Sequence, residues 1–551
     1  MTALVCALLF AAPAALLTAG PPAASNLFGT TSKSDLAEQI ETDLEAWDLS
    51  GAAKGLEALL HDFPDSPEAA YFEGRVLFEQ GKYDEAVKAF ETAASRADVP
   101  GSYHAMMNRG GQAVANEIRL AKAAAEETKG DHTFESEHFV FKTRPGKDTL
   151  LAPYALEALE KAYAGLTKDL GVTPSAKVRV EVYDSAKSLA HVSPLTVEQI
   201  KASGTIALCK YSRLMITSPK ALLRGYPWLD TVSHEFVHYL VTQKGRNTVP
   251  IWLQEGLAKF LETRWRGPPG MAVDEMSLTL LQDAARKNTL IPFAKMHPSI
   301  ALLPTQEQAA LAFAEVEAVV RLLYQRGGQA ALTELVSAMA SGMGDEQAVA
   351  QAYGKSFAQF QADWRADILK AKAAHKNAHP QAQKKLVFKE DAKGKKEPPN
   401  VAQKEEPKMD EEAKRAGRLG EILFARQRWA GAAKEYARAR EHLHMEVPII
   451  SRRYAFAEMK LGHFPEAEQA LKKAVEREPD DETTQALYAH ALIARKAWPE
   501  AREAIESGIA QDPFDPDLHA SYVEVARGLS DKPLEEREKN ALALAMGRGK
   551  E

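Results

Sequence analysis

Apolar residues recur at helical spacing along most of the chain and alternate with polar residues only in a short central stretch. The alternation in residues 138–142 and 177–183, and two further short apolar runs at 204–209 and 213–217, predict four strands. A helix is predicted between the first two strands, over residues 151–170. The pattern therefore predicts a mainly α protein with a small α+β part.

The helical region before this stretch, residues 34–128, contains an internal repeat. Ala52 and Leu56 are matched by Ala86 and Phe90, each 34 residues further on. This period resembles that of the tetratricopeptide repeat, a helix–turn–helix unit. The alternative is a plain helical hairpin packed on the neighbouring domain, because two units are few for an array.

The repeat is clearer in residues 413–530. A set of residues recurs at an offset of 34: Phe464, Ala467, Leu471, Ala474 and Pro479 correspond to Trp498, Ala501, Ile505, Gly508 and Pro513. A preceding unit carries Gly420, Trp429, Ala432, Tyr436 and Ala439, displaced by one residue. We interpret the region as three tetratricopeptide-like units, whose stacked helices form a groove that commonly binds peptides or protein partners. The alternative is an array that packs only against its own protein.

The composition of the remaining segments indicates a linker and an export signal. Residues 373–412 are polar, charged and Pro-containing, which is typical of a solvated tether. Residues 1–25 are apolar and interrupted by Pro13, which predicts a secretory signal peptide cleaved between Ala19 and Ser25. We therefore expect a periplasmic or secreted protein, or a membrane-anchored one if this segment stays attached.

Charge, cysteine content and hydrophobic length argue against a nucleic-acid partner, a disulfide and a transmembrane span. The formal net charge of −7 argues against a nucleic-acid partner. Only Cys209 would remain after signal cleavage, so no intramolecular disulfide is expected. No later stretch reaches the length of a transmembrane span, so none is expected in the mature chain.

The main candidate for chemistry is an H-E-x-x-H motif formed by His234, Glu235 and His238. Residues four apart share one face of a helix, so both imidazoles can reach one tetrahedral metal ion. A catalytic zinc needs a third protein ligand. Glu255 is the candidate, because the short connection at 244–249 would fold the next helix back beside the first. Glu235 lies next to the ligand stripe and is the candidate general base.

These motifs resemble those of the gluzincin clan of metallopeptidases, and in particular the peptidase-MA-like domains of envelope proteins. The resemblance covers His234, Glu235, His238, Trp252, Leu253, Glu255, Gly256, Ala258 and Glu262. It implies a zincin-like metallopeptidase domain, residues 131–372, between the two repeat regions. No G-A-M-E-N-like segment precedes the motif, which speaks against aminopeptidase specificity. By the same resemblance, strand 204–208 could pair with an extended peptide substrate.

The resulting prediction is a zinc-dependent peptidase in which Zn²⁺ is held by His234, His238 and Glu255. Glu235 would take a proton from a zinc-activated water and pass it to the leaving amine. The repeats would bind protein partners. The alternative is an envelope scaffold that binds partners through its repeats and carries an inactive metallopeptidase-like domain. A hydrolase acting on a non-peptide bond is a third option.

Several nearby residues have two interpretations. Glu262 could orient a ligand histidine or form a surface salt bridge. Asp230 could hydrogen-bond a ligand histidine or lie in the first turn of the motif helix, where negative charge is favoured, and we expect the second. Lys259 and Arg264 are expected to be surface charges.

Tyr324 and Tyr353 are positional candidates for stabilising an oxyanion. Both are expected to be core aromatics instead. Phe313 stands where the family often has a phenol, and it would remove that donor.

Overall fold

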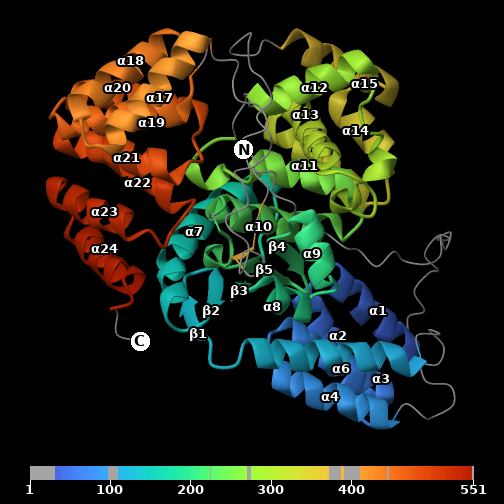
Figure 1. Cartoon of the computed structure of the whole chain (residues 1–551). Helices are drawn as coiled ribbons and strands as arrows, with labels where there is room; N and C mark the ends of the chain where they lie inside the picture. The colour runs from blue at the N-terminus through green and yellow to red at the C-terminus, as the bar shows by residue number, and fades with distance from the viewer. Residues whose placement is uncertain are drawn as a thin grey trace.

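The structure is a computed structural model of the whole chain, and Figure 1 shows three groups of elements along it. It describes residues 32–96, 110–223, 225–269, 275–371, 386, 388–389, 410–443 and 446–548. The predicted signal peptide and most of the predicted linker lie outside these residues. Among the described helices, none combines the length and the apolar character that a bilayer crossing requires.

The central domain is built on a five-stranded sheet with the order β1-β2-β3-β5-β4. The strands are β1 (His132–Glu135), β2 (Phe139–Thr143), β3 (Val178–Tyr183), β4 (Ala207–Lys210) and β5 (Arg213–Thr217). Strands β2, β3 and β5 run parallel, while β1 and β4 are antiparallel edge strands. The four predicted strands are confirmed. β1 was missed because it is short and largely exposed, so it lacks an apolar alternation.

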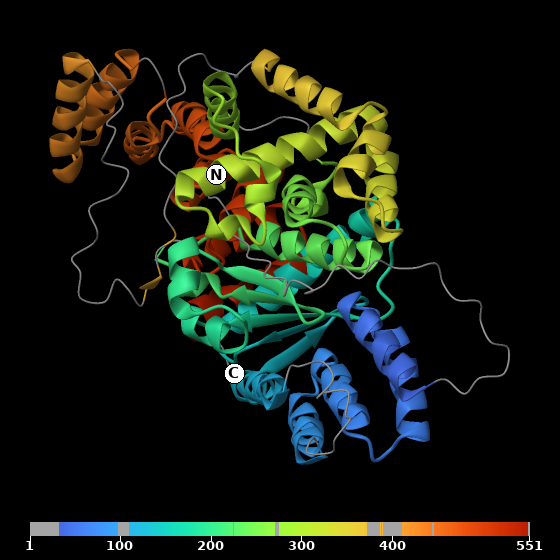
Figure 2. The same cartoon turned by 90° about the vertical axis from the view of Figure 1, so that its right-hand side faces the viewer.

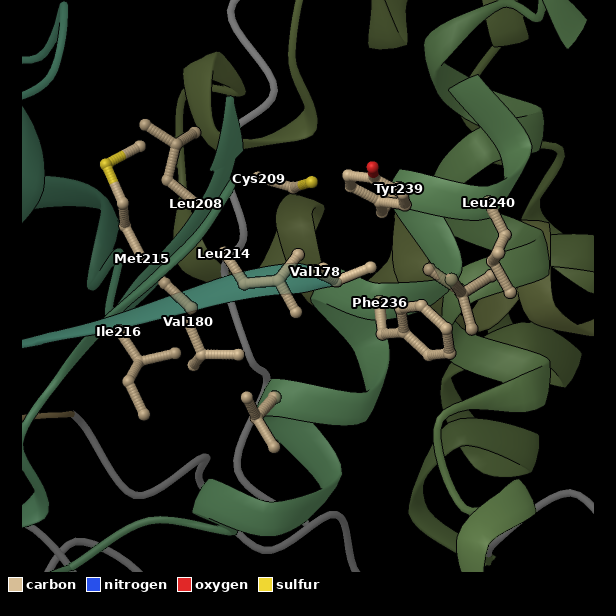
Figure 3. Close-up of a cluster of buried hydrophobic side chains, with 14 of the residues drawn as sticks. Val178, Val180, Leu208, Cys209, Leu214, Met215, Ile216, Phe236, Tyr239 and Leu240 are labelled. Carbon is tan, nitrogen blue, oxygen red and sulfur yellow. The ribbon is translucent and has the colours of Figure 1, made fainter. Parts of the chain in front are cut away.

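One face of the sheet packs against helix α10 (Trp228–Gly245), and helix α7 (Leu151–Leu170) packs against α10 and β2. The register aligns Val180, Leu214 and Cys209 across β3, β5 and β4, so their side chains share one face. Figure 3 shows Cys209 beside Tyr239 of α10, with Phe236 below them. All five of these side chains are buried, so the apolar face of the sheet holds the motif helix in place.

The N-terminal helices cover the opposite face of the sheet (Figure 2). They are α1 (Lys33–Glu45), α2 (Leu49–Asp62), α3 (Pro67–Glu79), α4 (Tyr83–Arg96) and α6 (Gly110–Glu127). Gly74 of α3 permits close packing, because a Cβ there would lie 2.5 Å from the ring of Phe90 in α4. This is the role expected of small residues at this position of a helix–turn–helix repeat.

Charged residues of β3 join the N-terminal helices to the sheet. Glu181 is buried and lies 3.1 Å from Arg213 Nη1 and 3.3 Å from Arg179 Nη1. Tyr83 of α4 donates a hydrogen bond to Glu181, and Arg179 donates to the carbonyl of Glu79 at 2.6 Å. Burial would raise the pKa of Glu181, but the two guanidinium groups outweigh it and lower that pKa to about 2.

The rest of the central domain is helical. It comprises α8 (Ala186–His191), α9 (Val197–Ser203), α11 (Ile251–Leu261), α12 (Glu275–Lys287), α13 (Gln306–Ala340), α14 (Asp345–Tyr353) and α15 (Phe357–Lys370). Helix α13 is interrupted at Gly328, whose φ of 60° is left-handed. Helix α11 packs between α10 and α13, and a Cβ at Gly256 would lie 2.6 Å from the carbonyl oxygen of Val316. Only glycine fits at this point of contact.

The C-terminal region is a row of helix pairs. The helices are α17 (Glu411–Ala425), α18 (Trp429–Glu441), α19 (Pro448–Lys460), α20 (Phe464–Arg477), α21 (Glu482–Ala494), α22 (Trp498–Ile509), α23 (Pro516–Gly528) and α24 (Lys532–Ala545). They form four pairs, one more than the three predicted units, because α23 and α24 add a pair that extends past residue 530.

The last helices of this row dock on the central domain. The Trp228 indole at the start of α10 donates to the carbonyl of Ile509 at 3.0 Å. The Tyr154 hydroxyl of α7 donates to Glu538 at 2.8 Å, and Glu538 also lies 2.9 Å from Nδ1 of the buried His519. The repeats therefore pack against their own protein at this end, while α17–α20 have separate small cores.

Part of the predicted linker is packed rather than solvated. Phe388 is buried and forms an antiparallel bridge with Leu222. A Cβ at Gly204 would lie 3.7 Å from Cδ1 of Leu386. The prediction of a tether with little to bury was wrong for these two residues, because their apolar side chains find a surface on the central domain.

We expect Glu181→Gln to lower the free energy of unfolding by about 3–5 kcal/mol, because two buried guanidinium groups lose their carboxylate. Urea unfolding at neutral pH measures this, with the exposed Glu57→Gln as the control. The folded-state pKa lies below the ordinary value, so the contribution is present above pH 4.5 and is lost as the pH falls towards 2. The free energies of unfolding of the wild type and of Glu181→Gln should therefore converge between pH 4.5 and pH 2. A difference between them that does not change with pH would contradict this account.

We expect Gly256→Ala to lower stability by about 1–3 kcal/mol, since the added methyl group meets the backbone of α13. Gly417→Ala is the matched control, because a Cβ at this helical glycine meets nothing within 4 Å. That change should stabilise the protein by about 0.5–1 kcal/mol. Calorimetry compares the two melting temperatures, and a rise in both would show that α13 yields to the methyl group.

Candidate metal centre

Helices α10 and α11 present the predicted ligands to one another. Helix α10 ends at Arg246, which adopts left-handed φ and ψ of 49° and 39°, and α11 begins at Ile251 directly after Pro250. This tight connection turns the chain back, as the spacing predicted. His234 and His238 lie one turn apart on α10, and Glu255 lies in the second turn of α11. All three side chains are fully buried.

The distances from Glu255 to the two histidines match those between ligands of a tetrahedral ion. Glu255 Oε2 lies 3.5 Å from Nε2 of His234 and 3.6 Å from Nε2 of His238. These separations are too long for good hydrogen bonds. A tetrahedral zinc with ligand distances of about 2.0–2.2 Å places two ligand atoms roughly 3.3–3.6 Å apart. All three donor atoms lie within 4.8 Å of one another.

The same atoms lack other partners within the described part of the chain. Nε2 of His234, both ring nitrogens of His238 and both oxygens of Glu255 are buried without a hydrogen bond there. Buried polar atoms are normally hydrogen-bonded, and several that converge on one point indicate a missing ligand. Two imidazoles and one carboxylate form a donor set that suits zinc. The residues present therefore fit the metal.

Glu262 orients His234 by contacting Nδ1, the ring nitrogen that points away from the other two ligands. Its Oε2 lies 3.0 Å from Nδ1 of His234, and its Oε1 accepts a hydrogen bond from Lys259. The contact with Nδ1 leaves Nε2 of His234 directed at the other two ligands. Both predicted roles of Glu262 are present, although its ion pair with Lys259 is buried rather than at the surface. The prediction for Lys259 was wrong, since its side chain is only 10% exposed.

The electrostatics of the pocket favour a positive charge among the ligands. Burial lowers the pKa of His234, but the Glu255 and Glu262 carboxylates outweigh it and raise this pKa to about 9. Burial raises the pKa of Glu255, and His238 and His234 more than offset it, so that this pKa is lowered. A bound divalent cation would supply the positive charge that this arrangement stabilises.

Glu235 lies on α10 between the two histidines and is fully buried. Burial raises the pKa of the Cys209 thiol, and the nearby Glu235 carboxylate raises it further. The carboxylate is therefore close to Cys209 in edge strand β4, and it is not part of the three-ligand group.

The other charged residues near the site tie the helices together. Asp230 lies in the first turn of α10, as predicted, and accepts hydrogen bonds from Trp265 at 2.8 Å and Arg266 at 3.0 Å. Arg264 donates to Asp169 of α7 at 2.6 Å, so it joins two elements instead of being only a surface charge. Sequence spacing gave no sign of these contacts, because Asp169 lies 95 residues away from Arg264.

The aromatic candidates on the later helices serve in packing. Tyr324 lies against Phe260 with ring centroids 5.2 Å apart. The Tyr353 hydroxyl donates to Asp363 at 2.9 Å. Phe313 is buried in the apolar core. The expectation that both tyrosines are structural agrees with these contacts.

Comparison with family models gives three matches. Residues 158–370 match the Peptidase MA superfamily, and this range includes all four predicted site residues. Residues 458–522 match one tetratricopeptide repeat model, and residues 43–102 and 73–131 match another. The N-terminal match favours the repeat interpretation over a plain hairpin.

Comparison with curated proteins gives no match. Among solved structures, yeast LTA4 hydrolase matches at 11% identity and a TM-score of 0.29, over 76% of this chain and 65% of that one. The same yeast enzyme in complex with Bestatin gives 10% identity and 0.29, over 76% and 67%. The APC/C hetero-tetramer Cut9-Hcn1 gives 11% and 0.23, over 93% and 94%. These scores are too low to carry an argument.

The family matches, together with the mainly helical fold and its small sheet, define the architecture. Residues 158–370 form a Peptidase MA superfamily domain, flanked on both sides by tetratricopeptide repeats.

Proposed function

We propose that the protein is a zinc-dependent peptidase whose repeat modules bind protein partners. The observation that carries the proposal is the convergence of His234, His238 and Glu255, with Glu255 at the separation of a tetrahedral zinc ligand from both histidines. Their donor atoms are buried, and Glu235 lies beside them. The match to the Peptidase MA superfamily supports the same reaction class.

Different residues of the chain would bind the metal, orient a ligand and transfer the proton. His234, His238 and Glu255 would hold the ion, and Glu262 would keep the His234 ring in its binding orientation. When bound, zinc supplies a Lewis acid that polarises a carbonyl and lowers the pKa of water. Glu235 would accept the proton of the attacking water and deliver it to the leaving amine, which is the role of a general base and then a general acid.

We further propose where the substrate binds and where in or outside the cell the protein is found. Glu235 interacts electrostatically with Cys209 of edge strand β4, where main-chain hydrogen bonds could align an extended peptide beside the metal. We also propose that the protein is exported, in the periplasm or outside the cell. The apolar N-terminal stretch supports this, and a membrane anchor would follow if it stays attached.

One observation favours the alternative of a scaffold with an inactive domain. All four site residues have no exposed surface, so a substrate reaches them only if the surrounding chain moves. A domain that never opens would keep its metal and its fold but would not turn over. Metal content and activity therefore have to be measured separately.

We expect purified protein to contain about one zinc ion per chain by mass spectrometry of metals, and His238→Ala to lose it. Glu262→Gln should weaken zinc affinity about 10–100-fold, because the His234 ring loses its orienting partner. His61→Ala is the control, since this histidine is exposed on an N-terminal helix. Equal zinc retention by the wild type and His238→Ala would place the ion elsewhere.

We expect the wild type to cleave casein and Glu235→Gln to lose about 10²–10⁴ of that rate, with zinc retained. Glu346→Gln is the matched control, because this glutamate is exposed in the same domain. The release of labelled peptides from casein measures the cleavage rate of each of the three proteins. Bound zinc in a wild type that cleaves no casein, with no effect of Glu235→Gln in the native host, would favour the scaffold.

A further inference from the structure

The C-terminal helix pairs stack through a recurring set of positions. The first helix of each later pair, α19, α21 and α23, packs on the second helix of the pair before it. Three positions on each of these helices repeat at an offset of 34: Ile450, Tyr454 and Ala457; Thr484, Tyr488 and Ala491; Leu518, Tyr522 and Val525. Ile450 and Ala457 share a core with residues of α18, Ala491 shares one with residues of α20, and Tyr522 donates to Glu506 of α22. These side chains are buried or half-buried. The set therefore marks the stacking face of a pair.

Helix α17 carries the same face without a helix pair before it among the described residues. The offset from α17 to α19 is 35, so the equivalent residues are Arg415, Leu419 and Ile422, followed one turn later by Arg426. Leu419 is 41% exposed and Ile422 is 46% exposed. We name Arg415, Leu419, Ile422 and Arg426 the open stacking face.

The chemistry of this face differs from that of a terminal cap. Terminal units of repeat arrays normally present a polar outer surface. Here two large apolar residues lie side by side on one helix face, at positions i and i+3. Arg415 and Arg426 stand at either end of them, and no side-chain hydrogen bond or ion pair of either is found among the described residues. The face is thus apolar in its middle and positive at both ends.

The chain's own linker is a poor cover for this face. Between residues 390 and 409, directly before α17, the only apolar side chains apart from alanine and proline are Val401 and Met409. This segment also contains Pro398, Pro399 and Pro407, which oppose a continuous helix. It can supply neither the length nor the apolar stripe of a stacked helix.

A second copy of the chain fits no better. If two α17 helices paired antiparallel, with Leu419 opposite Ile422, each Arg415 would face an Arg426 of the other copy, and like charges oppose such pairing. Head-to-tail stacking would need the outer end of α24. That end is covered, because Lys147 donates to the Ala545 carbonyl at 2.7 Å and Tyr154 donates to Glu538 at 2.8 Å.

We propose that the open stacking face binds an amphipathic helix of a partner protein. The helix would lie antiparallel to α17, in the place of the second helix of a preceding pair. It would present a stripe of small and apolar residues to Leu419 and Ile422, with acidic residues at both ends for Arg415 and Arg426. Small residues are expected because Ala467 and Ala470 of α20 share a core with Ala491 of α21, the residue equivalent to Ile422. This inference is independent of the peptidase assignment.

Photo-crosslinking in the native cells tests the occupant, using the full chain with Leu419→p-benzoylphenylalanine. We expect one protein to be crosslinked, and we expect the crosslinked peptide to be an acidic amphipathic helix. The matched control places the same residue at Leu369, which is 41% exposed on α15 and should not capture that protein. A crosslink to residues 372–409, to a second copy or to a non-acidic peptide, or no crosslink, overturns the proposal.

A charge-swap experiment tests the chemistry in vitro by fluorescence anisotropy. The probes are two stapled helical peptides with the same alanine–leucine stripe, one with glutamates and one with lysines at both ends. We expect the full chain to bind the acidic peptide at least ten-fold more tightly, and Arg415→Glu with Arg426→Glu to reverse the preference. Leu419→Glu should abolish binding of both, with an unchanged circular dichroism spectrum. Equal affinities, or no binding of either peptide, overturn the proposal.

Discussion

The close contact between α11 and α13 is the constraint on which the candidate metal centre depends. Glu255 reaches the two imidazoles only because α11 runs back beside α10, and α11 can lie there only because Gly256 has no side chain to meet the carbonyl of Val316. The ligand and the residue that permits its position are thus neighbours in sequence. The left-handed turn at Arg246 closes the connection between the two helices, so backbone geometry and packing fix the donor set together.

The buried charges around the site, and those that join the repeat helices to the central domain, obey one physical rule. A buried charge is stable only with partners. Glu262 is shared by His234 and Lys259, Glu181 by Arg179 and Arg213, and Glu538 by Tyr154 and His519. The first group orients a ligand, and the other two attach the N-terminal and C-terminal helices to the central domain. Specific polar contacts therefore determine where the repeats sit, in addition to apolar area.

Sequence patterns predicted those parts that depend on residues close in the chain. Helix α7 has the predicted bounds, and the spacing of four between His234 and His238 with a short connection to Glu255 brought the three ligands together. The prediction failed where partners are remote. The polar positions of β3, Arg179 and Glu181, alternate with valines and look solvent-facing, but they are covered by a helix pair about 100 residues away. Lys259 looked exposed for a different reason: its partner Glu262 is only three residues away, but both side chains are buried by the surrounding fold.

The two ends of the C-terminal array differ in a way that follows from these contacts. At one end, α22–α24 pack on the central domain, and Ile509 receives the indole N–H of Trp228, six residues before His234 on the same helix. The start of the metal-site helix is therefore part of the interface with the repeats, and the large apolar core runs through both without interruption. At the other end, α17 and α18 share only a small core with α19 and contact nothing of the central domain through it. An array that is anchored beside the site and open at its far end would hold a partner bound there in a fixed orientation relative to the candidate metal centre, because each intervening helix pair is packed on the next.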